Sequence, residues 1–95
     1  MNICQVNFSS DATSVSKKNK FISLLEQHPE GVAIYSKYGG KAHAVLLTDY
    51  IDNVFYVVDP VYGKKVTMAE STLYSKSATQ TSRLAALHSY WYIKH

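Results

Sequence analysis

Apolar and polar residues alternate in short runs along most of this chain, and such alternation is typical of strands with one buried face. These runs span residues 2–8, 32–37, 42–50, 54–59, 65–67 and 90–93. One segment follows a different period, because Phe21, Leu24 and Leu25 recur at helical spacing. This spacing predicts a helix from about Val15 to Gln27.

The residues between these runs indicate where the elements begin and end. Ser14 or Ser16 is the expected cap of the helix, since a hydroxyl there accepts from the free amides of the first turn. His28 is expected to end the helix rather than to bind a ligand, because it precedes a proline. Further along, residues 68–74 are expected to form one helical turn and residues 81–87 a short helix.

The order of these elements predicts an α+β fold. We expect a twisted antiparallel sheet of about five strands, with one main helix that packs Phe21, Leu24 and Leu25 against one face. A chain of 95 residues with 46% hydrophobic content can form one compact core. Residues 1–95 are therefore expected to form a single domain.

Two polar residues stand in the pair of strands that is richest in apolar residues. His43 opens one strand and Asp59 closes the next, so an antiparallel hairpin places both at the same end. A longer connection or a bulge puts both side chains on one face, where an imidazole and a carboxylate can form an orienting pair. A tight turn at Asp52-Asn53 shifts the register by one residue and separates them.

Four segments, taken in order, carry a resemblance to a known family. They are His28-Pro-Glu-Gly-Val-Ala-Ile-Tyr35, His43-Ala-Val-Leu-Leu-Thr-Asp-Tyr50, Phe55-Tyr-Val-Val-Asp-Pro60 and Tyr90-Trp-Tyr-Ile93. Together they resemble the C-terminal half of papain-like cysteine peptidases of the bacteriocin-processing branch. The resemblance covers most of the chain after residue 8, and it implies that His43 is the catalytic base and Asp59 its orienter.

The family's nucleophile is a Cys at a helix start in a preceding lobe, after a Gln. Here the one cysteine, Cys4, lies in an alternating run and stands before Gln5. We expect Cys4 to be a half-buried strand residue far from His43. The resemblance therefore implies a lobe that hydrolyses a peptide or protein substrate once a Cys-bearing lobe is supplied. The alternative is a catalytically inactive module that keeps the peptidase sheet and binds peptides or proteins.

The absence of that lobe leads to two structural expectations. The sheet face that bears His43 should lack its cover, and a second copy of the chain is expected to cover it. His43 and Asp59 should be hydrogen-bonded or one small rotation apart, because their strands must pair to bury Val45 and Val57 in any case. A carboxylate beside the ring should also favour the charged imidazole.

Composition narrows the other classes of function. The net charge is +3, and the one basic cluster, Lys17-Lys18-Asn19-Lys20, is expected to be a solvated helix face rather than a nucleic-acid site. The four histidines lack the spacing of a helical zinc motif, so we expect no metal and no cofactor. No signal peptide or long apolar run is present, which predicts a soluble chain without a membrane partner and leaves its compartment open.

Overall fold

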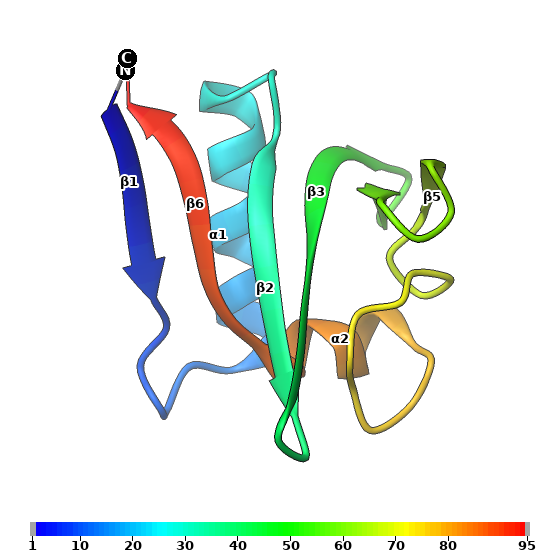
Figure 1. The fold of residues 1–95 in the computed structure, drawn as a ribbon. Helices are drawn as coiled ribbons and strands as arrows, with labels where there is room; N and C mark the ends of the chain where they lie inside the picture. Colours follow the sequence, from blue (N-terminus) through cyan, green and yellow to red (C-terminus); the bar gives the residue numbers. More distant parts are fainter. Residues whose placement is uncertain (1, 95) are drawn as a thin grey trace.

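A single antiparallel sheet of six strands frames the computed structural model, which describes residues 2–94 (Figure 1). In chain order the elements are β1 (Asn2–Asn7), α1 (Ser14–Gln27), β2 (Val32–Tyr38), β3 (Lys41–Ile51), β4 (Val54–Asp59), β5 (Lys64–Thr67), α2 (Gln80–Ala86) and β6 (Leu87–Lys94). The strand order is β1-β6-β2-β3-β4-β5, so the last strand lies between the first and the second. The predicted α+β class is confirmed, with six strands in the described range rather than about five.

Helix α1 begins at a capping box. The Thr13 hydroxyl accepts from the N–H of Ser16, and the Ser16 hydroxyl accepts from the N–H of Thr13, both at 3.0 Å. The predicted caps, Ser14 and Ser16, are therefore wrong, because the cap is Thr13. Ser16 is the third residue of the helix and completes the capping box. The helix ends as predicted, with His28 as its C-cap.

The core lies between α1 and the sheet. Phe21 is fully buried, and its ring meets the rings of Phe8 and Tyr90 edge-on, each at a centroid distance of 5.6 Å. Leu24 is buried beside it and Leu25 partly so, which confirms the predicted packing of the helix. The other buried apolar residues of the core are Val32, Ile34, Val45, Leu47, Phe55, Val57, Met68, Leu73, Leu84 and Leu87.

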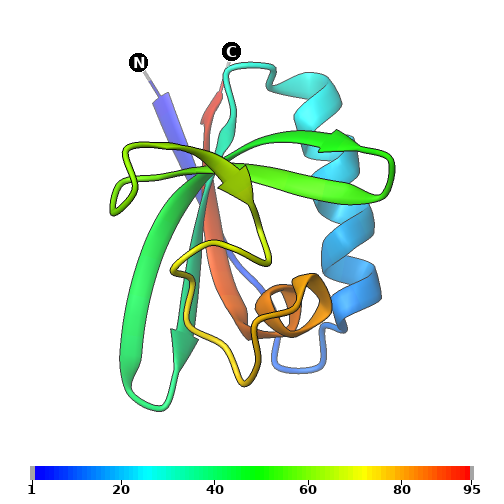
Figure 2. The same ribbon diagram turned by 90° about the vertical axis from the view of Figure 1, so that its right-hand side faces the viewer.

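The segment between β5 and α2 contains neither helix nor strand. Turns and bends replace the predicted helical turn over 68–74, and α2 begins at Gln80, one residue before its predicted start. Met68 and Leu73 are buried in the core, so apolar contacts hold the segment to the body of the domain. Figure 2 shows this segment running from the end of β5 to α2.

One face of the sheet carries the helices, and in residues 2–94 no helix covers the other face (Figures 1 and 2). Leu46 is 37% exposed there and lines a shallow apolar groove with Trp91. Val45 and Leu47, which share a face with His43, are instead buried in the core. The prediction that the face bearing His43 lacks its cover is therefore wrong, and the bare face is the opposite one. The reason for placing a second copy over His43 is removed with it.

Candidate active site

The strands that carry the candidate pair are joined by a tight turn. Asp52 and Asn53 connect β3 to β4, and their φ angles of 51° and 68° are those of a type I′ hairpin turn. The residues on either side of the turn pair directly with each other. On its own, this turn would place His43 and Asp59 on opposite faces of the sheet.

A bulge at Thr48 corrects the register. Leu47 and Asp49 pair with consecutive residues of β4, so Thr48 is an extra residue with no place in the strand register, although its hydroxyl donates to the carbonyl of Tyr56 at 3.4 Å. Every residue of β3 before the bulge is thereby displaced by one position relative to an unbulged ladder. This displacement returns His43 to the face that carries Asp59. Of the registers that the sequence left open, the bulged one is present.

His43 and Asp59 face each other at the end of the hairpin. The distance from Nε2 of His43 to Oδ1 of Asp59 is 3.6 Å, just beyond the length of a hydrogen bond. The carboxylate is fully buried, whereas the imidazole is 24% exposed. Nε2 is buried, while Nδ1 lies on the accessible side of the ring. A small rotation of the ring closes the gap, so the predicted proximity is confirmed, whereas the catalytic role stays a prediction.

The carboxylate of Asp59 is held by donors from two segments. Thr72 donates its N–H to Oδ2 at 2.6 Å and its hydroxyl to the same oxygen at 2.8 Å. Val61 donates its N–H to Oδ1 at 3.0 Å. Burial raises the pKa of Asp59, but the hydrogen bonds from Thr72 and Val61, together with the nearby ring of His43, outweigh it and hold that pKa below its usual value. Asp59 is therefore ionised at neutral pH and can orient an imidazole without taking its proton.

The ring of His43 is bordered by Tyr74. The two rings meet edge-on at a centroid distance of 6.2 Å. The N–H of Tyr74 donates to the Ser36 hydroxyl at 2.9 Å, and Ser36 pairs with His43 across β2 and β3. Tyr74 therefore restricts the approach to the imidazole on one side and leaves Nδ1 accessible on another.

No thiol of the described chain, residues 2–94, lies near this pair. Cys4 is a half-buried residue of β1, as predicted. In the sheet β6 and β2 separate β1 from β3, which places Cys4 and His43 at least about 14 Å apart at about 4.8 Å per strand. The hydroxyl of Ser36 is fully buried and already accepts from Tyr74. The predicted separation of Cys4 from His43 is confirmed.

Two partners of Asp59 were missed by sequence reasoning. An aspartate often accepts from the N–H two residues on, so Asp59-Pro60-Val61 held a signal for the bond from Val61. Thr72 had no such signal, because it lies in a segment without any hydrophobic period. Only the folded chain places that threonine against the carboxylate.

Comparison with known proteins adds no relative to this picture. No family model matches the chain, and searches of curated proteins and of solved structures found no similar protein. The resemblance to papain-like peptidases therefore stays a prediction. Within residues 2–94, no group of three or more His, Cys, Asp or Glu side chains is arranged to hold a metal ion. Neither helix of this range is long and apolar enough to cross a membrane.

Proposed function

We propose that this chain is the His/Asp-bearing lobe of a papain-like cysteine peptidase, which hydrolyses peptide bonds once a Cys-bearing lobe is supplied. The observation that supports this most is the 3.6 Å approach of a buried, ionised Asp59 to Nε2 of His43, with Nδ1 left accessible. A base held in this way by a carboxylate is what activation of a thiol requires. The order and spacing of the sequence motifs support the choice of family.

In the proposed reaction His43 acts through Nδ1. This nitrogen takes the proton of the partner lobe's thiol, and the thiolate attacks the carbonyl carbon of the scissile amide. Nδ1 then gives the proton to the amine as the C–N bond breaks and a thioester forms. It next takes a proton from the water that attacks the thioester carbonyl, and it returns this proton to the sulfur as the C–S bond breaks. Asp59 keeps the Nε2 proton in place and stabilises the imidazolium in both steps.

The proposed site needs two partners, which are a thiol donor and a peptide or protein substrate. A Cys-bearing lobe can come from the rest of a longer protein or from another chain. A second copy of this chain is the other candidate, but it brings only Cys4, which is half-buried on an edge strand. We therefore favour a separate Cys-bearing lobe.

The alternative function is an inactive module that binds peptides or proteins on the peptidase sheet. The distance of Cys4 from His43 favours this alternative for the isolated chain, since no covalent step is possible there. In that case Tyr74 and His43 provide contacts to the ligand, and His43 takes part in no proton transfer.

Cleavage of a fluorogenic peptide tests the proposal. The assay uses the chain alone and the chain joined to any segment that its gene encodes upstream, with and without a thiol-directed peptidase inhibitor. We expect no cleavage by the chain alone and inhibitor-sensitive cleavage by the longer protein. His43→Ala should lower kcat/KM of that protein by about a hundredfold or more, because general acid–base catalysis is lost.

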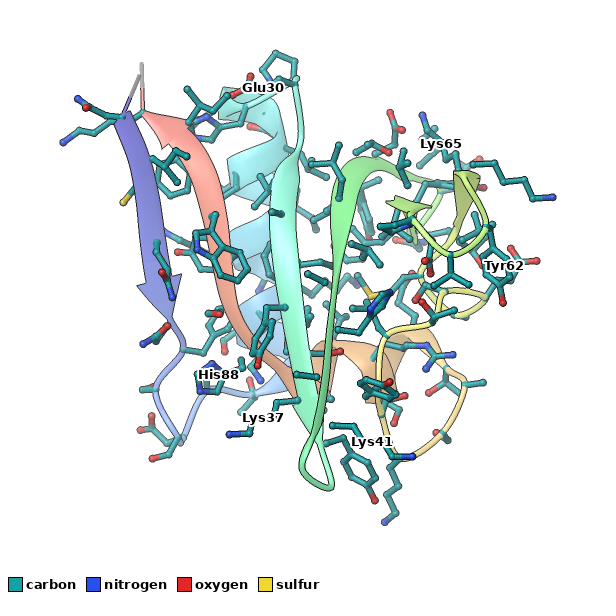
Figure 3. All side chains as sticks on the ribbon, in the orientation of Figure 1. Glu30, Lys37, Lys41, Tyr62, Lys65 and His88 are labelled. Atoms are coloured by element: carbon teal, nitrogen blue, oxygen red, sulfur yellow. The ribbon has the colours of Figure 1, made fainter. Side chains whose placement is uncertain are left out.

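Two matched variants control for altered folding. His88→Ala removes an exposed histidine at the start of β6. In Figure 3 this histidine lies on the other side of β2 from Lys41, which begins the strand that carries His43. Asp49→Asn removes a carboxylate of β3 that accepts a hydrogen bond from Lys65. Both should keep activity. Full cleavage by His43→Ala would contradict the proposal, and peptide binding without cleavage by the longer protein would support the alternative.

A further inference from the structure

A single guanidinium holds the irregular segment between β5 and α2. Arg83 of α2 donates Nε–H to the carbonyl of Met68 at 3.2 Å and Nη2 to that of Ala69 at 3.0 Å. Its Nη1 donates to the carbonyl of Leu73 and, at 3.0 Å, to the hydroxyl of Ser75. The segment has no helical or strand ladder of its own, so these bonds fix the course of its backbone.

Thr72 lies between the carbonyls that Arg83 binds. Ala69 and Leu73 accept from the guanidinium on either side of it. From that position Thr72 donates both its N–H and its hydroxyl to Asp59. The direction of a backbone N–H follows from the peptide planes around it, so the bond to Asp59 depends on the carbonyls that Arg83 holds.

We propose that Arg83 is a positioning residue for the His43–Asp59 pair, because it fixes the segment 68–75 and this segment presents Thr72 to the carboxylate. A carboxylate without that anchor can rotate away from Nε2 of His43. The catalytic meaning of this link rests on the proposed peptidase function, whereas the link itself is a property of the isolated chain.

The shape of the guanidinium is what this role requires. Arginine carries five N–H donors in a planar fork, and Arg83 directs four of them at four acceptors. A lysine would carry the same charge on one nitrogen and could not reach all of these acceptors together. Arg83→Lys therefore separates the geometry of the side chain from its charge.

The charge of Arg83 is a second way in which this residue affects the pKa of Asp59. Burial lowers the pKa of Arg83, while Tyr62 and the Asp59 carboxylate raise it. Arg83 and Asp59 thus attract each other directly as well as through Thr72. If charge were the whole effect, a lysine would replace the arginine without loss.

An NMR titration of the Asp59 carboxyl carbon in a set of variants distinguishes the two routes. Arg83→Gln should raise the pKa of Asp59 because both hydrogen bonds from Thr72 are lost, and Thr72→Val should raise it less because only the hydroxyl bond is lost. Arg83→Lys keeps the direct attraction and should still raise that pKa, and adding Thr72→Val to Arg83→Lys should raise it no further. Additive shifts, or an unchanged Asp59 in Arg83→Lys, would overturn the proposal.

Lys65→Gln is the matched control for loss of a cation. Lys65 donates to Asp49 at the surface of the same sheet, and within residues 2–94 no hydrogen bond or ion pair joins its side chain to the segment 68–75. This variant should leave the titration of Asp59 unchanged. A shift as large as that of Arg83→Gln would mean that net charge, not the position of Thr72, determines the pKa of Asp59.

Hydrogen exchange in the unaltered chain tests the link even if Arg83→Gln fails to fold. Nε–H of Arg83 and the N–H of Thr72 should exchange through the same opening, with equal protection after correction for intrinsic rates. Exchange of the Arg83 proton about tenfold faster than that of Thr72 would overturn the proposal. Neither readout needs a thiol or a peptide, so this inference and the proposed peptidase function can fail separately.

Discussion

Nζ of Lys17 and the carbonyl oxygen of Leu87 lie 2.8 Å apart, which ties α1 to the end of α2. The same nitrogen donates to the carbonyl of Ala85 at 2.9 Å and lies 5.2 Å from the ring centroid of Phe8. Lys17 is only 5% exposed, and burial lowers its pKa. The expectation that the cluster 17–20 is a solvated helix face is therefore wrong at this position. The free carbonyls at the C-terminal end of α2 satisfy the ammonium group.

Replacing Lys17 by Met should lower the free energy of unfolding by about 1–3 kcal/mol, because one buried and one partly buried acceptor lose their charged donor. Urea denaturation measures the change. Lys20→Met, at an exposed position of the same helix, should change stability by less than about 0.5 kcal/mol. Equal effects of the two variants would mean that Lys17 contributes nothing through these bonds.

Local patterns predicted the elements of this fold because each pattern reports on its own residues. The helical spacing of Phe21, Leu24 and Leu25 identifies the buried side of α1 without reference to the sheet. The alternation around Val45 and Val57 likewise identifies two strands with one buried face each. The bounds of these three elements are predicted to within one residue, whereas β6 begins at Leu87, three residues before its predicted start.

Contacts between distant segments could not be predicted in this way. Lys17 donates to Ala85 and Leu87, which stand 68 and 70 positions further along the chain. Nothing near Lys17 in the sequence distinguishes it from the lysines beside it. Thr72 reaches Asp59 from an irregular segment. The register of the hairpin also remained open, because it depends on where β3 accommodates Thr48, and threonine is ordinary in any part of a strand.

Deletion of Thr48 should keep His43 and Asp59 together. Thr48 has no register partner in β4, so its removal leaves a regular ladder in which all the remaining residues of β3 keep their faces. Deletion of Leu46 also removes one residue from β3, but the unbulged ladder then puts Thr48 in the buried place of Leu47 and turns Leu47 outward, with a loss of about 1.5–3 kcal/mol for that side chain alone. Contacts of the His43 ring, followed by NMR, and thermal unfolding measure both effects.

The relative effects of these two deletions test the role of the bulge at Thr48. We expect the chain without Thr48 to fold and to keep the contact between the rings of His43 and Tyr74. The chain without Leu46 should be less stable than the chain without Thr48, because Leu47 is no longer buried. A chain that tolerates loss of Leu46 better than loss of Thr48 would contradict the role assigned to the bulge.

Asp59→Asn should make the chain less stable at neutral pH and less sensitive to acid. The pKa of Asp59 in the folded chain lies below its usual value of 3.8, so folding favours the ionised form. Its contribution to stability is present above that usual value and is lost as pH falls through the lowered pKa. The variant should cost roughly 1.5–3 kcal/mol at neutral pH, and this difference should shrink in acid.

Urea denaturation across a pH series measures this difference. Asp49→Asn is the matched control, because Lys65 lowers the pKa of Asp49 but the carboxylate is 36% exposed. Its loss should cost less than about 1 kcal/mol, as for other surface ion pairs. Equal acid sensitivity of the wild-type chain and Asp59→Asn would show that Asp59 does not link folding to pH.

The Nε2 proton of His43 should be visible by NMR as a slowly exchanging resonance shifted downfield. Nε2 is buried and lies 3.6 Å from Oδ1 of Asp59, so a proton there is shielded from water and directed at a carboxylate. Asp59→Ala should abolish this resonance, because the proton loses its acceptor and water enters the space. The exposed ring of His88 should give no such signal in either chain. A protected proton on Nδ1 of His43 instead would place the basic nitrogen on the buried side, out of reach of any thiol, and would remove the pair from the proposed mechanism.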